Sequence, residues 1–158
     1  MQNSNLEIQH LVSHNTDSKA TFSRSGLYIK TKICKEYQSH IHTNIKIDIN
    51  GIDEYIMITV SFEKEKIKKK AYTTHSFKNK HEELKTIHLK PKRLDTTGLF
   101  NPLFELLENS NNTSLGLELI HHLFNEDGNL SLYFVVNKKN YINGIITELN
   151  STQLQAVH

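Results

Sequence analysis

Regular alternation of apolar and polar residues over 41–62 is the strongest pattern in the chain. The alternation is interrupted at Asn50-Gly51, a dipeptide that accepts the positive φ angles of a type I′ hairpin turn. A two-residue loop at this point would place the apolar side chains of both flanking segments on one face, with Glu54 opposite Ile47 as the one mismatch. The pattern therefore predicts a β-hairpin that turns at Asn50-Gly51.

Other patterns predict more strands and a small number of helices. Alternation predicts strands over 27–33, 86–89, 130–136 and 141–149, with the last two joined by a turn over 137–140. Asn101-Pro102 is typical of a helix start, because asparagine caps helices and proline fits their first turn. The spacing of the leucines favours a second helix over 115–124, although an alternating strand also fits these residues.

These elements define the expected fold class. Hairpin connections and strands with one polar face are typical of antiparallel sheets that carry helices on one side. We therefore expect an α+β fold, a mostly antiparallel β-sheet of about five to seven strands with one or two helices packed on one side. Residues 1–20 are expected to form a flexible polar N-terminus, and residues 21–158 a single domain.

Composition adds expectations about the compartment. The chain has 158 residues, of which 37% are apolar, so it can bury a core of its own. No apolar run approaches the ~20 residues of a membrane helix, and the first residues lack the pattern of a signal peptide. Cys34 is the single cysteine, which excludes an intrachain disulfide and fits a reducing compartment. We therefore expect a cytoplasmic protein without membrane contact, in which Cys34 is a bystander thiol.

Charge is distributed unevenly along the chain. The formal net charge is +2, but residues 64–93 hold 11 basic and 3 acidic side chains, whereas residues 94–158 hold 2 basic and 7 acidic ones. A lysine-rich stretch with interleaved aromatic residues is typical of a surface that binds an anionic partner. The chain has only two arginines, which argues against recognition of specific bases.

The leading interpretation is a small non-enzymatic binding protein that engages an acidic partner, either an acidic protein surface or the backbone of a nucleic acid. The candidate partner-binding residues are Lys64, Lys66, Lys68, Lys69, Lys70, Lys78, Lys80, Lys90, Lys92 and Arg93. A plainer interpretation is that these lysines protect a strand edge against aggregation. If these lysines pair with the acidic side chains of residues 94–158 within the chain, no basic surface is left for a partner.

Two other functions remain open from the sequence. A metal-independent nuclease or phosphodiesterase would use histidines of the basic segment as general acid and base, with a lysine holding the phosphate. Its candidate catalytic residues are His75, His81, His88 and Tyr72. The third possibility is a structural or assembly subunit, which would form a stable multimer.

Metal and cofactor chemistry finds little support in the sequence. His40 and His42 have the i, i+2 spacing of metal ligands on a strand, but no further ligand follows at a supporting spacing. His121 and His122 are adjacent, so they cannot face the same way, and we expect them to be packed or partly buried. No Gly-rich phosphate loop is present. The sequence therefore predicts no metal site and no cofactor.

Overall fold

The computed structural model describes residues 20–37, 44–64, 70–93, 95 and 97–142. The strands are β1 (Ala20–Ser23), β2 (Gly26–Ile29), β3 (Ile45–Ile52), β4 (Tyr55–Phe62), β5 (Tyr72–Lys78), β6 (Leu84–Pro91), β7 (Ser114–Phe124) and β8 (Leu130–Asn137). The helices are α2 (Thr31–Glu36), α3 (Asn101–Ser110) and α4 (Lys138–Ile142). None of the described helices is long and apolar enough to cross a membrane.

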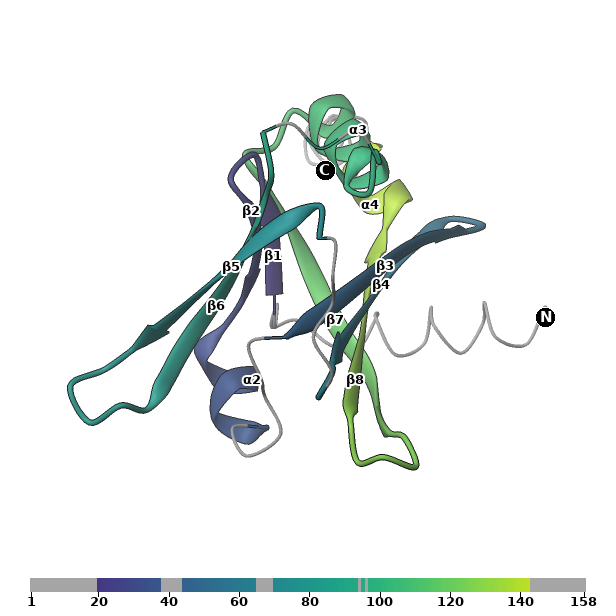
Figure 1. The fold of residues 1–158 in the computed structure, drawn as a ribbon. Helices are drawn as coiled ribbons and strands as arrows, with labels where there is room; N and C mark the ends of the chain where they lie inside the picture. The colour runs from purple at the N-terminus through teal and green to yellow at the C-terminus, as the bar shows by residue number, and fades with distance from the viewer. Residues whose placement is uncertain (1–19, 38–43, 65–69, 94, 96, 143–158) are drawn as a thin grey trace, which may run out of the picture.

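Within the described residues, the eight strands form one antiparallel sheet in the order β3-β4-β8-β7-β1-β2-β6-β5. The sheet curls into a half-barrel, with the β3–β4 and β5–β6 hairpins projecting on opposite sides (Figure 1). The hydroxyl of Tyr72 on β5 donates a hydrogen bond to the carbonyl of Ile45 on β3. These strands are the two edges of the sheet, so the edges meet at this corner.

The core lies on the concave side of the sheet, which we call the inner face. Alternate residues of each strand point inward, as strand geometry requires, and the inward side chains of β4 and β8 are almost entirely apolar. The fully buried members include Phe22, Leu27, Ile29, Ile45, Ile58, Phe62, Leu89 and Phe134. The predicted α+β class with a mostly antiparallel sheet is confirmed, but the described residues form eight strands and three helices, more than the five to seven strands and one or two helices expected.

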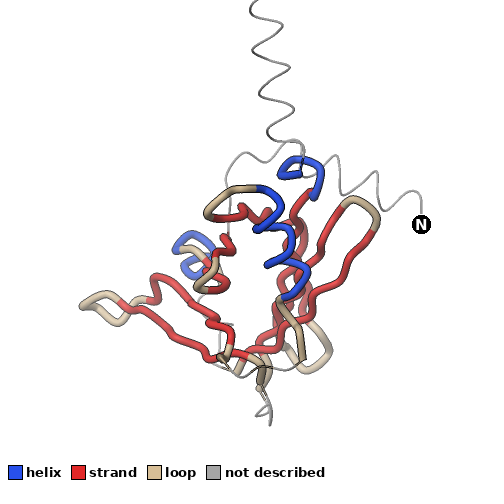
Figure 2. The backbone as a smooth tube through the Cα atoms, turned by 90° about the horizontal axis from the view of Figure 1, so that it is seen from above, coloured by secondary structure: helices blue, strands red, loops and turns tan. Residues whose placement is uncertain are grey.

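Helix α3 covers part of this core. Its three leucines, Leu103, Leu106 and Leu107, are buried, and the Phe104 ring packs edge-on against Phe22 of β1 with centroids 4.9 Å apart. Seen from above, α3 lies between the β3–β4 and β5–β6 hairpins (Figure 2). The helix predicted to start at Asn101-Pro102 is present, but its cap differs: the N-cap residue is Phe100, Asn101 is the first helical residue, and no side chain caps the helix.

The predicted hairpin forms with a different turn. The turn lies at Asp53-Glu54, Ile52 pairs with Tyr55, and Ile47 pairs with Val60. This register replaces the predicted contact between Ile47 and Glu54 with an apolar pair. Gly51 lies within β3, and Asp53 takes the positive φ of 52° instead, because an aspartate tolerates this conformation and the apolar pairing favours it.

Three other predicted elements also differ from the structure. The strand predicted over 27–33 ends at Ile29, because helix α2 follows and buries the adjacent Ile33 and Cys34. Residues 114–124 form strand β7 and not a helix, since Leu115, Leu117 and Leu119 pack against the core at every second position, whereas Leu123 is exposed. Helix α4 replaces the predicted turn over 137–140, and residues 143–149 lie outside the described part of the chain.

Candidate functional site

Three aromatic rings stand in a row on the outer face, the side of the sheet opposite the core. They are Tyr28 of β2, His88 of β6 and His75 of β5, which the strand register places directly beside one another. Tyr28 and His88 are stacked, with ring centroids 4.1 Å apart and an interplanar angle of 2°. The His88 and His75 centroids are 6.0 Å apart. The row therefore follows from strand spacing, since neighbouring strands lie about 4.8 Å apart.

His88 is the anchored member of the row. Its side chain is only 8% exposed, and its Nε2 lies 2.7 Å from the carbonyl oxygen of Ser25 in the β1–β2 turn. A carbonyl only accepts, so Nε2 carries the proton in this contact. His75 is exposed, and its Nε2 lies 3.3 Å from the Thr73 hydroxyl. The row therefore joins a buried, hydrogen-bonded ring, His88, to a solvent-accessible one, His75.

The β1–β2 turn can hold His88 because Gly26 brings the two backbones close. A Cβ at Gly26 would lie 2.4 Å from the carbonyl oxygen of Leu89, and the φ of Gly26 is +125°. No other residue fits both the contact and the backbone angle. The glycine therefore fixes the position of β6 against the turn that receives His88.

An exposed aromatic ring and a cation flank the row on the same face. Phe77 is two residues beyond His75 on β5 and is 52% exposed. Lys90 is two residues beyond His88 on β6 and pairs with Thr73. The outer face of the β5–β6 hairpin thus carries a row of rings that ends at an exposed His75, with Phe77 and a lysine beside it. We call Tyr28, His88, His75 and Phe77 the ring platform.

The predicted partner-binding residues do not all come together. Lys64 lies at the end of β4, and its Nζ donates to the carbonyl of Asp127 in the β7–β8 turn. Lys78 and Lys80 lie at the tip of the β5–β6 hairpin, and Lys90, Lys92 and Arg93 lie at the opposite end of β6. Lys70 immediately precedes β5. Lys66, Lys68 and Lys69 lie outside the described residues.

The described part of the basic segment retains an excess of positive charge. Residues 70–93 contain seven basic and two acidic side chains, a net charge of +5. Among the described residues, the recorded ion pair joins Lys139 to Glu54, at 2.6 Å. No described carboxylate therefore pairs with the lysines of the β5–β6 hairpin within that part of the chain.

The four candidate catalytic residues occupy three separate places. His75 and His88 lie side by side, whereas His81 lies at the tip of the hairpin. Tyr72 is buried on the inner face and bonded to Ile45, and burial raises its pKa to about 12. The depressions described on the surface are lined by residues of α3, α4 and the β1–β2, β3–β4 and β7–β8 hairpins, and none contains these four side chains.

The other histidines and the cysteine lie elsewhere. His40 and His42 lie outside the described residues. His121 and His122 are exposed and not packed as expected, because they lie beyond the core at the far end of β7, where His122 Nδ1 lies 3.1 Å from the Tyr37 hydroxyl. Among the described residues, no three side chains of the metal-ligating types form a cluster. Cys34 is buried on α2, and burial raises its pKa to about 11.

Sequence reasoning identified His75 and His88 as candidates but not their arrangement, and it assigned no role to Phe77. Their alignment depends on the pairing of β5 with β6, and β5 itself was not predicted. The alternation of Tyr72, Thr74 and Ser76 with the outward residues was the available signal, although the polar inner residues weaken it. Tyr28 was predicted to lie on a strand and had no assigned role.

The ring platform and the depressions of the described surface are the features from which a function can be argued. We compared the chain with protein-family models, with curated proteins and with solved structures, and none of them matches.

Proposed function

We propose that the outer face of the β5–β6 hairpin binds single-stranded nucleic acid. The observation that carries the proposal is the ring platform, in which three rings stand in register across three strands beside the half-exposed Phe77. Bases stack on exposed aromatic side chains whatever their sequence, with ~1–3 kcal/mol per base. A base would stack on Phe77 or on the open side of His75.

The lysines of the hairpin would supply the contacts to phosphate. Lys90 lies at one end of the platform, and Lys78 follows Phe77 at the tip of the hairpin, about 17 Å away along the strands at ~3.3 Å per residue. Lysines are point charges without the fork geometry that reads guanine, so the binding would be insensitive to sequence. This division of roles, rings for bases and lysines for phosphates, favours nucleic acid over an acidic protein. An acidic protein would use the lysines alone.

The anchoring of His88 supports the proposal on energetic grounds. A ring that is already fixed by the Ser25 carbonyl and by stacking on Tyr28 loses little side-chain entropy when a ligand binds. The platform is therefore preorganised, while the exposed His75 and Phe77 are the residues available to the ligand.

The test is a titration of labelled oligothymidylate and oligouridylate against the protein, followed by fluorescence anisotropy at several salt concentrations. We expect affinity to fall steeply with salt, and Lys78→Glu together with Lys90→Glu to weaken binding and lower the salt slope by about one for each lost contact. Lys139→Glu is the matched control, because Lys139 is exposed on α4, away from the β5–β6 hairpin.

Two results would overturn the proposal. One is the absence of binding at low salt, and the other is an equal effect of the hairpin and Lys139 variants. Binding of polyglutamate in place of the oligonucleotides, sensitive to the lysine variants and insensitive to Phe77→Ala, would assign the face to an acidic protein partner.

A further inference from the structure

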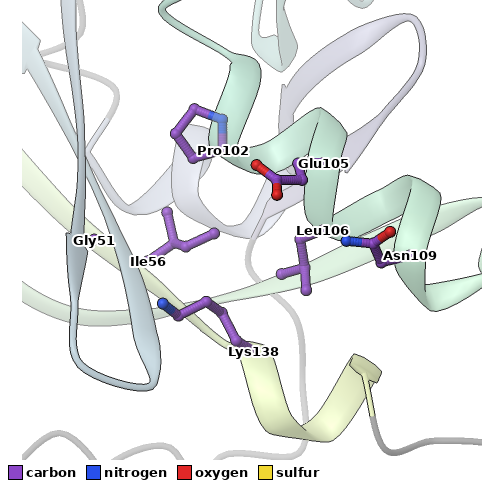
Figure 3. Close-up of a pocket in the computed structure, with 7 residues that line it drawn as sticks. All are labelled: Gly51, Ile56, Pro102, Glu105, Leu106, Asn109 and Lys138. Carbon is purple, nitrogen blue, oxygen red and sulfur yellow. The ribbon is translucent and has the colours of Figure 1, made fainter.

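A depression of about 240 Å³ lies between helix α3, the start of α4 and the β3–β4 hairpin, away from the ring platform. Figure 3 shows its floor and rim: Ile56 and Leu106 lie between the side chains of Glu105 and Lys138. Ile56 and Leu106 are each 3% exposed, so the floor is apolar and is part of the core surface. The depression thus combines an apolar floor with charged walls.

Helical spacing places the α3 residues of the site on one face. Glu105 and Leu106 follow Pro102 by three and four positions, and Asn109 follows them by four and three. This spacing aligns the four residues along the side of α3 that faces the hairpin. Lys138 is the first residue of α4, and its backbone N–H donates to the carbonyl of Glu54 at 2.8 Å. This bond ties the start of α4 to the β3–β4 turn and fixes the second wall.

The two charged side chains of this site are opposite in sign and do not form an ion pair with each other. Glu105 and Lys138 both line the depression, yet the ion pair recorded among the described residues is formed by the neighbouring Lys139 with Glu54. A carboxylate and an ammonium that face a shared apolar space complement a ligand bearing both charges. A ligand with a single charge would form an ion pair with only one of these two side chains.

We propose that this depression binds a free α-amino acid with an aliphatic side chain. The ligand ammonium would bond to Glu105, its carboxylate to Lys138, and its side chain would rest on Ile56 and Leu106. The volume is below the ~300–1,000 Å³ typical of sites for drug-sized molecules, which favours a ligand of this size over a nucleotide. The proposal is independent of the ring platform.

The test uses calorimetric titration of the full chain with L-leucine and two truncated analogues. 4-Methylpentanoate lacks the ammonium, and 3-methylbutylamine lacks the carboxylate. Each loses one charge-assisted contact, so we expect each to bind roughly tenfold or more weakly than leucine. Equal affinity of leucine and either analogue, or no binding of leucine, would overturn the proposal.

Paired variants assign the roles of the two walls. Glu105→Gln should remove the preference for leucine over 4-methylpentanoate, and Lys138→Met should remove the preference over 3-methylbutylamine. The matched controls are Glu108→Gln, which lies on α3 outside this depression, and Lys139→Met, which is adjacent to Lys138 and pairs with Glu54. Loss of leucine binding in the controls to the same extent as in the test variants would contradict the assignment.

Discussion

The hydroxyl of Tyr72 donates a hydrogen bond to the backbone carbonyl of Ile45, and this bond joins the two edge strands of an otherwise open sheet. Tyr72 is 4% exposed, and the Ile45 side chain is fully buried. The curl of the half-barrel is therefore held at one corner by a side chain and not by strand pairing. Tyr72, which the sequence suggested as a catalytic candidate, therefore has a structural role: it links the two edge strands.

Tyr72→Phe tests this link through the pH dependence of stability. Burial raises the pKa of Tyr72 from 10.0 to about 12, so between these values the unfolded chain releases a proton that the folded protein retains. The unfolded state then binds fewer protons, and stability falls as pH rises. We expect the variant to be less stable by about 1 kcal/mol at pH 8, where one hydrogen bond is lost.

The wild type's advantage over Tyr72→Phe in free energy of unfolding should shrink above pH 10, by up to about 1.4 kcal/mol per pH unit. Urea unfolding at intervals from pH 8 to pH 11 measures it. A difference that stays constant over this range would show that the Tyr72 hydroxyl is not buried in the folded protein.

Phe77→Ala should weaken binding of single-stranded nucleic acid without affecting the fold. The side chain is half exposed, so its removal costs little packing, whereas the lost stacking corresponds to ~1–3 kcal/mol, roughly a fivefold to 150-fold decrease in affinity. Ile52→Ala is a suitable comparison, because Ile52 is also an exposed hydrophobic residue but lies at the tip of the β3–β4 hairpin. Anisotropy and thermal unfolding of both variants separate binding from stability.

Gly26→Ala should destabilise the protein by more than about 2 kcal/mol. An added Cβ would overlap the Leu89 carbonyl oxygen at 2.4 Å and would force an L residue to adopt a φ of +125°. Because the β1–β2 turn also holds His88, the variant should lose affinity for nucleic acid together with stability. Chemical denaturation provides the measurement, and a variant within 0.5 kcal/mol of the wild type (about the effect of an ordinary surface substitution) would contradict the close approach.

The register of the β3–β4 hairpin can be tested with glycine substitutions. Gly51 has no atom within 4 Å of an added Cβ and lies in a strand, so Gly51→Ala should be neutral or stabilising by up to about 1 kcal/mol. Asp53 has a φ of 52°, so Asp53→Gly should also be tolerated. A turn at Asn50-Gly51 would give the opposite result for Gly51→Ala, with a clear loss of stability.

The hairpin shows how far sequence patterns reach. Alternation correctly identified two paired strands, because it depends on burial of one face, which the structure shows for Ile45, Ile47, Ile58 and Val60. The turn was placed by local propensity at Asn50-Gly51, and pairing of apolar residues across the strands outweighed that propensity. The mismatch of Glu54 with Ile47 indicated that a different strand register would bury more apolar surface.

The ring platform was less predictable than the fold. Its members are separated by up to 60 positions, from Tyr28 to His88, and their contact depends on β2 pairing with β6. No periodicity within one segment encodes such a pairing. Similarly, the depression on α3 requires Lys138, at the start of a helix where the sequence predicted a turn.

The central position of β1 determines the order in which this sheet can be assembled. Ala20 pairs with Leu117, whereas the β3–β4 and β5–β6 hairpins each connect strands that are consecutive in the chain. During synthesis both hairpins can form early, but one side of β1 stays without a neighbour until β7 has left the ribosome. Closing so long a loop is entropically costly and slow, so joining β1 to β7 is expected to set the folding rate. Until then the open side of β1 is exposed to pairing with another copy of the chain, as is the open side of β4, which waits for β8.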